Sequence, residues 1–283
     1  MNREELYASI YSHNTVYRPP QEEESALLEV SLGCSWGKCL FCDFAKDAFC
    51  IHPMEKIEES ARILGQLEGE KNRVFFLGEN ALVLSMEQHR RVFQAVHTYM
   101  PKVTQAAMYA RVDDVLRKSE EELLELKALG LCDLHIGVES GSDSILLMMN
   151  KGVTSYDTIT ALKRLDKVGI GYYVTVILGL GGKTFRNLHA IETARMLNQV
   201  HPKHIWCLAL TLWPKTPLYQ MVQRGEYDVL SPWEILLEER ILVENLNIEC
   251  MFMDTTALGQ FTIQGFLPQG KEGIIRAINR LLG

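Results

Sequence analysis

Apolar segments alternate with amphipathic segments along most of the chain. Between the apolar segments, hydrophobic residues recur at helical spacing, which predicts a regular alternation of strands and helices. The predicted strands, several of them rich in Val, Ile, Tyr or Phe, span residues 26–32, 73–78, 103–111, 132–139, 172–179 and 204–213. The predicted helices between them span residues 54–68, 85–100, 119–129, 155–168 and 184–200.

Local signals mark the ends of several predicted helices. Ser85, Ser119 and Ser231 are each followed three residues later by Gln or Glu, which is the pattern of a capping box. Gly130 and Gly169 stand where left-handed C-terminal caps are expected. We therefore expect helices to begin after these serines and to end at these glycines.

Strands that alternate with helices form parallel sheets built from right-handed β-α units. An open doubly wound sheet and a partial barrel both fit this pattern. Alternation along each strand except the second leaves one face with polar or small side chains, suited to a lumen that admits ligands. These faces carry Gln105, Ala107, Tyr109 and Arg111 in the third strand, His135, Gly137 and Glu139 in the fourth, Tyr173, Thr175, Ile177 and Gly179 in the fifth, and Cys207, Ala209 and Thr211 in the sixth.

The two ends of the chain depart from this alternation. The acidic run 21–25 near the N-terminus is expected to be a solvated approach to the first strand. Towards the C-terminus the pattern predicts a helix over 231–247, an irregular stretch over 248–270 and a helix over 272–282. The expected parts are an N-terminal extension (1–25), a barrel domain (26–220) and a C-terminal helical extension that packs on or closes the barrel (221–283).

The composition is that of a globular protein with a substantial core. Of 283 residues, 47% are hydrophobic and 23% are charged, and the formal net charge of −7 offers no global basic field for nucleic acid. No apolar run approaches the roughly 20 residues that cross a bilayer, and the first residues resemble no signal or transit peptide. Seven cysteines without a secretion signal favour a reducing compartment. We therefore expect a cytoplasmic protein that has no membrane partner and is unlikely to bind nucleic acid.

Three of the seven cysteines, Cys34, Cys39 and Cys42, follow the first predicted strand in a C-x4-C-x2-C spacing. Thiolates this close are soft ligands suited to zinc, copper(I) or an iron–sulfur cluster. A structural zinc takes four protein ligands, and an electron-transfer [4Fe–4S] cluster normally takes four cysteines. Three cysteines would therefore leave one iron free to bind a substrate or cofactor. Two alternatives stay open: a zinc knuckle or inert thiols, and a closed cluster with Cys50 as its fourth ligand.

With Phe41 directly before its third cysteine, this loop resembles the cluster loop of the radical S-adenosylmethionine (SAM) superfamily, although the commonest spacing there is C-x3-C-x2-C. The chain has the general look of the oxygen-independent coproporphyrinogen-oxidase-like Fe–S oxidoreductases. The resemblance implies an α/β fold, a partial (β/α)6 TIM-like barrel with a C-terminal helical extension. It also implies a [4Fe–4S] cluster held by Cys34, Cys39 and Cys42, S-adenosyl-L-methionine as the second cofactor, and a reducing electron donor of the flavodoxin or ferredoxin type.

Segments at successive strand ends resemble the superfamily's SAM-binding motifs. Gly78-Glu79-Asn80 resembles its Gly-Gly-Glu motif, in which backbone carbonyls or the glutamate accept hydrogen bonds from the SAM ammonium group. Glu139 and Ser140 resemble its ribose-binding segment, and the ends of the fifth and sixth strands resemble segments that contact adenine. The cofactor-binding residues implied by the resemblance are Phe41, Gly78, Glu79, Asn80, Arg111, Glu139, Ser140, Ile177, Gly179 and Thr211.

The resemblance implies that the reduced cluster cleaves SAM, giving a 5′-deoxyadenosyl radical that abstracts hydrogen from an unidentified small-molecule substrate. Candidates for a catalytic role are Arg111, His135 and Glu139. Arg111 could grip an anion or pair with Glu139, His135 is more often a core histidine than a proton donor, and His189 on a predicted helix is expected to be structural. The alternatives are an RNA-modifying radical SAM enzyme, a non-catalytic iron–sulfur electron-transfer protein, and a zinc-stabilised binding module.

Overall fold

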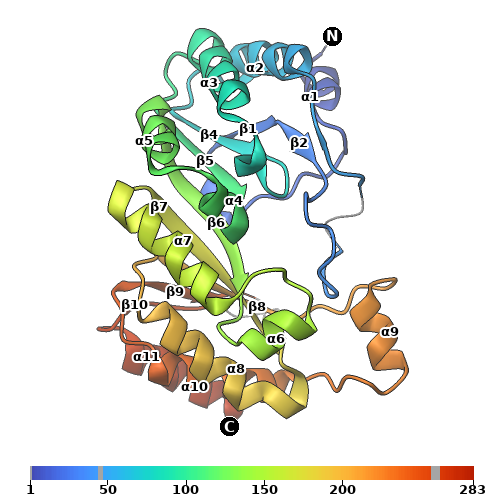
Figure 1. Cartoon of the computed structure of the whole chain (residues 1–283), viewed down its shortest axis with the longest axis vertical. Helices are drawn as coiled ribbons and strands as arrows, with labels where there is room; N and C mark the ends of the chain where they lie inside the picture. The colour runs from blue at the N-terminus through green and yellow to red at the C-terminus, as the bar shows by residue number, and fades with distance from the viewer. Residues whose placement is uncertain (1, 44–46, 256–261) are drawn as a thin grey trace. The chain divides into compact units, whose positions relative to one another are not determined.

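A computed structural model describes residues 2–43, 47–255 and 262–283 of the chain. It consists of two units: unit 1 contains residues 1–37 and 44–135, and unit 2 contains residues 38–43 and 136–283. Strand β6 (Leu131–Glu139) begins in unit 1 and ends in unit 2. The main sheet has the strand order β1-β4-β5-β6-β7-β8-β9-β10 (Figure 1). Because this order is linear and the sheet is mostly parallel, the predicted α/β fold of TIM-like type is confirmed.

Unit 1 is built on parallel strands that pair in sequence order. Leu27 lies opposite Phe75, and Phe75 lies opposite Ala107. Helix α2 packs against both β1 and α3 (Figure 1). The strands are β1 (Ala26–Glu29), β4 (Arg73–Leu77) and β5 (Gln105–Ala110), with a short ribbon of β2 (Ser31–Leu32) and β3 (Cys50–Ile51). The helices are α1 (Arg3–Ile10), α2 (Met54–Glu68), α3 (Met86–Tyr99), α4 (Val112–Arg117) and α5 (Glu120–Leu129), with 3-10 turns η1 (Pro20–Glu22) and η2 (Ala81–Val83).

Unit 2 continues the sheet and adds helices from the second half of the chain. Helix α10 packs against both α8 and α11 (Figure 1). The strands are β7 (Gly171–Leu178), β8 (His204–Ala209), β9 (Cys250–Asp254) and β10 (Ile263–Leu267), of which only β10 pairs antiparallel. The helices are α6 (Asp143–Met148), α7 (Ser155–Val168), α8 (Gly182–Leu197), α9 (Pro217–Gln223), α10 (Pro232–Asn245) and α11 (Lys271–Leu282).

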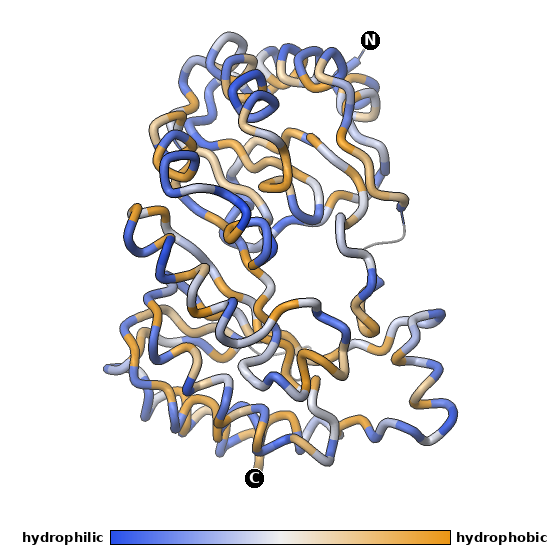
Figure 2. The backbone as a smooth tube through the Cα atoms, in the orientation of Figure 1, coloured by the Kyte–Doolittle hydropathy of each residue, from blue (hydrophilic) through white to orange (hydrophobic). Residues whose placement is uncertain are grey.

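The helices begin and end where local sequence signals place them. Ser85, Ser119 and Ser231 each cap a helix through the predicted reciprocal box. Gly130 and Gly169 end α5 and α7 in the left-handed conformation. Figure 2 shows apolar residues along the strands and mixed polar and apolar positions along the helices, as expected for elements that share a core. Among the described residues, no helix combines the length and hydrophobicity that a membrane span needs.

The segment from 248 to 270 differs from its prediction as an irregular stretch. β9 and β10 form there and add two strands to the sheet. The alternation of buried and half-exposed side chains in β9 reflects a strand that covers one face with apolar groups. Residues 256–261, which belong to the same predicted stretch, lie outside the described residues.

The register of β8 shows that the wrong side chains were predicted to lie on its inner face. The inner face is the face of the sheet that points away from the helices. In β7 the buried face carries Val176, whereas Thr175 is half-exposed. Cys207 pairs with Val176 and is fully buried, while Trp206 pairs with Thr175. Cys207 and Ala209 were therefore wrongly predicted to face the lumen, and Thr211 lies beyond the end of the strand. The small cysteine side chain fits under the covering helices, and the larger Trp206 occupies the open face.

Two residues of the N-terminal extension pack onto the inner face of unit 1. Tyr11 and Val16 lie against an apolar cluster that includes Leu27 and Phe75. The Tyr11 hydroxyl donates to the backbone oxygen of Leu27 at 3.0 Å. An apolar face of a sheet must be covered, and in unit 1 these residues from before the first strand help to cover it.

Glu22 contradicts most clearly the prediction that the acidic run 21–25 is solvated. Its side chain is fully buried and accepts two hydrogen bonds from Arg73, one from Nε at 2.8 Å and one from Nη2 at 2.6 Å. His135 Nε2 lies 2.9 Å from the same carboxylate, and Asp133 lies 3.0 Å from Arg73. The acidic residue is therefore buried because basic groups of β4 and β6 meet it there.

Candidate functional site

The cysteine loop is divided between the two units. Cys34 belongs to unit 1, whereas Cys39 and Cys42 belong to unit 2, and all three are half-buried cysteines that form no disulfide. Cys50, the alternative fourth ligand, is exposed on β3. Within the described ranges, no three histidine, cysteine or acidic side chains are gathered in a geometry that could hold a metal ion. The three-cysteine ligand set therefore stays a prediction from the spacing of the loop.

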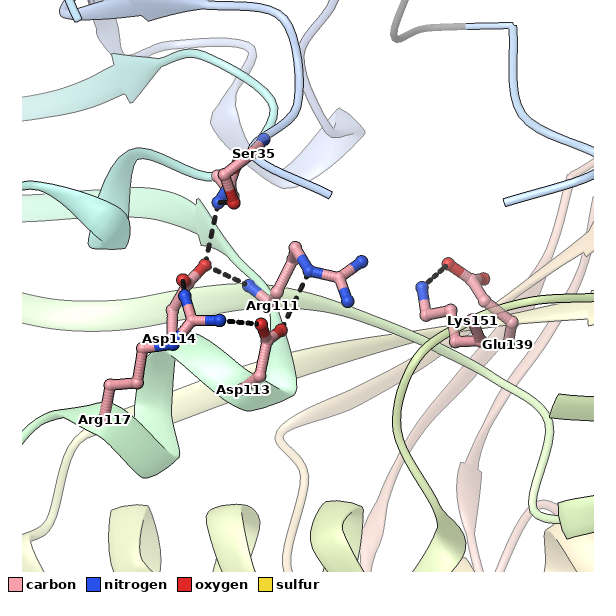
Figure 3. A network of polar contacts seen from close by, with 8 residues as sticks. Ser35, Arg111, Asp113, Asp114, Arg117, Glu139 and Lys151 are labelled. Carbon is pink, nitrogen blue, oxygen red and sulfur yellow. Dashed lines mark hydrogen bonds and ion pairs between the residues drawn. The ribbon is translucent and has the colours of Figure 1, made fainter. Parts of the chain in front are cut away.

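The first half of the loop is held by the side chain of Asn80. Its Oδ1 accepts from the backbone N–H of Ser35 at 3.1 Å, and its Nδ2 donates to the Ser35 hydroxyl at 2.7 Å. Nδ2 also donates to Asp114 Oδ2 at 2.9 Å (Figure 3). Asn80 and Asp114 are both buried, and burial raises the pKa of the Asp114 carboxyl despite the hydrogen bond from Asn80. The amide of Asn80 therefore positions the residue that follows Cys34.

Arg111 lies at the exit of β5 and contacts the same part of the loop. Its guanidinium stands 5.3 Å from the ring centroid of Trp36, a cation–π distance. Its Nε donates to Asp113 Oδ1 at 2.8 Å, and Asp113 also pairs with Arg117 at 2.7 Å (Figure 3). Arg111 is thus a buried cation that contacts Asp113 and the residue two positions after Cys34.

The second half of the loop is held by main-chain contacts within unit 2. The N–H of Leu40 donates to the backbone oxygen of Met149, and the N–H of Leu218 donates to the oxygen of Leu40, both at 3.0 Å. Asn150 donates to the oxygen of Lys38 at 3.0 Å. The predicted cofactor-binding Phe41 is buried in an apolar cluster with Met149 and Leu218. The aromatic residue before the third cysteine therefore anchors this half of the loop.

Glu79 follows β4 and carries an unusual carboxyl group. Its Oε2 is buried and has no hydrogen-bond partner within the part of the chain that the structure describes. Burial raises the pKa of this carboxyl, and the nearby carboxylates of Asp47 and Glu29 raise it further. A buried acceptor without a donor costs free energy unless a ligand supplies the donor. This is the property expected of a residue that receives an ammonium group.

Glu139 ends β6 in a left-handed conformation, with φ of 64°. Lys151 Nζ lies 2.9 Å from its Oε1 (Figure 3), while its Oε2 is buried and meets no hydrogen-bond partner in residues 2–43, 47–255 and 262–283. The carboxylate folds back over Gly137, where a Cβ would lie only 2.2 Å from Oε1. Backbone strain of this kind in a residue with a side chain is typical of functional sites. One carboxylate oxygen is thus fixed by a lysine, and the other is available to a hydroxyl or ammonium donor.

The remaining predicted cofactor residues lie at strand ends of unit 2 and at the end of β4. Ser140 is buried directly after Glu139. Ile177 is half-exposed on the inner face of β7, and Gly179 follows that strand with a left-handed φ of 87°. Thr211 is exposed on the segment after β8, and in unit 1 Gly78 follows β4. Their positions agree with the rule that α/β proteins place ligands at the carboxyl ends of parallel strands.

The two histidines considered from the sequence are both buried. His135 contacts Glu22, and the rings of Phe75 and Tyr109 lie at centroid distances of 5.5 and 6.1 Å. These contacts favour a structural role for His135 over proton donation. His189 bonds to Glu238 and to the backbone of the residue that ends β6. It is therefore less remote from the predicted site than its helical position suggested.

Sequence reasoning missed the side chains that position the predicted residues. Lys151 pairs with Glu139, and Asp114 accepts from Asn80. Asp114 could have been found, because it stands at the third helical position after Arg111 and its carboxylate accepts from the Arg111 backbone N–H at 3.3 Å. Lys151 carries no such signal, since it follows a short helix that the hydrophobic pattern does not predict.

The residues present fit a SAM-binding iron–sulfur protein. Three cysteine side chains on one loop are suitable iron ligands. Buried carboxylate oxygens of Glu79 and Glu139, which have no hydrogen-bond partner among the described residues, are suitable acceptors for ammonium and hydroxyl groups. The cysteine ligands and the carboxylate acceptors therefore match the two cofactors implied by the loop, an iron–sulfur cluster and SAM.

Comparison with known proteins places these features in a family. The model of the radical SAM superfamily matches residues 28–194. A heme chaperone, HemW of Bacillus subtilis (strain 168), is 25% identical over 245 residues, covering 83% of this chain and 61% of that protein. A tRNA-2-methylthio-N(6)-dimethylallyladenosine synthase of Hahella chejuensis is 25% identical over 241 residues, covering 79% of this chain and 51% of that protein.

A solved structure shows the same fold. Coproporphyrinogen III oxidase (HemN) from Escherichia coli superimposes with a TM-score of 0.59 at 13% identity, covering 86% of this chain and 56% of that chain. At this identity the likeness concerns the fold alone. The chain spans only 51–61% of the length of the two relatives above, so their activities do not transfer as a whole.

Proposed function

The chain belongs to the radical SAM superfamily, and from this premise we propose that it is an enzyme that cleaves SAM reductively and starts hydrogen abstraction from a small-molecule substrate. Members of the superfamily use a [4Fe–4S] cluster and SAM. The observation that carries the proposal is the loop of three cysteines outside any disulfide, Cys34, Cys39 and Cys42, because three ligands leave one iron for SAM. The chain would need a low-potential electron donor, for which a flavodoxin or ferredoxin is the proposed partner.

The residues of the chain bind and orient the two cofactors. Cys34, Cys39 and Cys42 hold the cluster, which when reduced supplies the electron for cleavage of the carbon–sulfur bond. Glu79 accepts hydrogen bonds from the ammonium group of SAM through its unpartnered oxygen. Glu139, held by Lys151 through one oxygen, accepts from a ribose hydroxyl through the other.

Arg111 is proposed to face the carboxylate of SAM. A guanidinium that is already held through Nε by Asp113 and stacked on Trp36 keeps its terminal nitrogens in one orientation. Such preorganisation lowers the entropy cost of a bidentate contact with a carboxylate. The proposed contact uses the terminal nitrogens, because Nε is engaged by Asp113.

The names of two similar proteins suggest which small molecules to test first. One relative is a heme chaperone and one structural neighbour is a coproporphyrinogen oxidase. Tetrapyrroles are therefore the first candidate class. An RNA substrate is the second candidate, favoured by the similarity to a tRNA-modifying enzyme and disfavoured by the net charge of −7.

The proposal is tested by anaerobic reconstitution with iron and sulfide, followed by incubation with SAM and dithionite. Formation of 5′-deoxyadenosine, measured by mass spectrometry, is the expected result, and Cys39→Ala should abolish both cluster binding and product. Cys50→Ala should retain the cluster, whereas in an electron carrier with four cysteine ligands it would lose it. A colourless protein that binds zinc, or a reduced cluster that leaves SAM intact, would contradict the proposal.

The substrate class is tested separately. Deuterium transfer from a labelled tetrapyrrole into 5′-deoxyadenosine would identify a small-molecule substrate. Transfer from deuterated tRNA and none from tetrapyrroles would instead support the RNA alternative.

A further inference from the structure

One buried pair of side chains in unit 2 joins two strand ends. His189 of α8 and Glu238 of α10 are hydrogen-bonded through Nδ1 and Oε1, with exposed fractions of 1% and 0%. The other ring nitrogen of His189, Nε2, lies 3.2 Å from the backbone oxygen of Glu139. The other oxygen of Glu238, Oε2, accepts from the backbone N–H of Gly179 at 3.1 Å. The pair therefore connects the exit of β6 to the exit of β7.

Both backbone positions that the pair contacts have unusual conformations. Glu139 has a φ of 64°, a left-handed conformation that is unfavourable for a residue with a Cβ. Gly179 has a φ of 87°, and its own carbonyl oxygen accepts from the Tyr227 hydroxyl at 2.7 Å. A strained residue persists only where surrounding contacts fix it. The hydrogen bonds of the pair are contacts of this kind, because they end on the backbone atoms of these two turns.

The donor and acceptor at each end of the His189 ring can be assigned. A backbone carbonyl can only accept, so Nε2 of His189 must carry a hydrogen that points at Glu139. Nδ1 then shares a proton with the Glu238 carboxyl, whose second oxygen remains free to accept from Gly179. A leucine at position 238 would remove both side-chain hydrogen bonds, whereas a glutamine there could still accept from Gly179 and donate to Nδ1.

We propose that His189 and Glu238 are positioning residues for SAM, which fix the backbone of Glu139 and Gly179 so that these two turns can hold the adenosine moiety. This role rests on the proposed function, in which both turns bind SAM. The pair acts through the turns and does not itself touch the ligand. An ion pair that served only to join α8 to α10 would have no need of contacts to the two strand ends.

The test compares Glu238→Leu and His189→Gln with Glu239→Leu. Glu239 is the matched control, because it is the next residue of α10 and is also fully buried. Hydrogen exchange of peptides that contain Gly179 is followed by mass spectrometry in protein free of SAM. The dissociation constant of SAM is measured by anaerobic equilibrium dialysis of cluster-loaded protein, together with KM and kcat for 5′-deoxyadenosine formation and the melting temperature of every variant.

Glu238→Leu, which removes the hydrogen bond to Gly179, should speed exchange there, weaken SAM binding by about tenfold and raise KM for SAM, with a smaller change in kcat. His189→Gln should weaken SAM binding similarly, and Glu239→Leu should leave affinity and exchange as in the wild type. Equal affinity in all four proteins, or an equal loss in Glu239→Leu, would overturn the positioning role alone. A wild-type protein that binds no SAM would overturn the proposed function and this role with it.

Discussion

Glu22→Gln is expected to destabilise the protein strongly, although the residue lies in a polar N-terminal segment. Burial alone would raise the pKa of the Glu22 carboxyl, but hydrogen bonds from Arg73, His135 and Ser25 outweigh it and lower the pKa from 4.5 to about 2. The folded state therefore favours the ionised carboxylate. Its contribution to stability is fully present above pH 4.5 and is lost as the pH falls towards 2.

The size of this contribution follows from the two pKa values. Each pH unit between the folded and unfolded pKa corresponds to about 1.4 kcal/mol, so a fall from 4.5 to about 2 corresponds to roughly 3 kcal/mol. The amide group introduced by the substitution would also place a donor beside the Arg73 guanidinium. Asp133, 3.0 Å from the same guanidinium, keeps Arg73 partly paired. We therefore expect a loss of roughly 3 kcal/mol at pH 7, the lower end of the range for breaking a buried ion pair.

The assay is urea unfolding of wild type and variant at pH 7, 5 and 4, followed by circular dichroism. The difference in unfolding free energy should be largest at pH 7 and should begin to shrink as the pH falls below 4.5. Glu24→Gln is the matched control, because Glu24 lies two residues away and is exposed. Its effect should stay within about 0.5 kcal/mol.

Two results would refute this reasoning. One is a Glu22→Gln variant with the urea midpoint of the wild type at pH 7. The other is a loss in Glu24→Gln as large as that in Glu22→Gln, which would attribute the effect to net charge and not to the buried contact.

Three further predictions concern buried groups. Gly137→Ala should weaken SAM binding measured by dialysis while the chain still folds, because the new Cβ would lie 2.2 Å from Glu139 Oε1 and would displace that carboxylate; unchanged affinity would contradict the described position of the carboxylate. Burial lowers the pKa of His89 from 6.5 to about 4, so the free energy of unfolding should fall by roughly 3 kcal/mol as the pH drops from 6.5 to 4. The urea midpoint of His89→Leu should therefore depend less on pH over this range than that of the wild type. An equal dependence would exclude His89 as the source of the pH effect. Burial and the carboxylate of Asp254 raise the pKa of Glu239 well above its usual value, so the free energy of unfolding should fall as the pH rises above 4.5. Glu239→Gln should therefore raise the melting temperature more at pH 8 than at pH 5. An equal rise at both pH values would count against a charge effect.

The sequence was sufficient to predict elements whose signals are local. The hydrophobic period and the caps placed the helix over 155–168 at its observed bounds, Ser155–Val168, because Thr154 and Gly169 close both ends. The short helices were missed, since a segment such as α6 is too brief to show a period. β9 and β10 were missed because strands of five residues each, beside a predicted helix, give a weak pattern.

Part of the candidate site could likewise be predicted from local sequence signals, and part could not. The cysteine spacing and the positions of Glu79 and Glu139 at strand ends could be read from the chain, because strand ends follow from the alternation of elements. Side chains that contact the site from other elements, such as Lys151 and Glu238, could not be predicted from the sequence. The inner face of β8 was mispredicted because side-chain size alone does not reveal on which side of a sheet a helix lies.

The packing of the N-terminal extension has a practical consequence for shortened versions of the protein. A chain begun at Ala26, where the barrel was predicted to start, would lack Tyr11 and Val16 over the apolar face of unit 1 and would leave Arg73 without Glu22. Such a fragment would expose an apolar surface to solvent and would be prone to aggregate. Trimmed forms made for crystallisation should therefore retain every residue from Tyr11 onward.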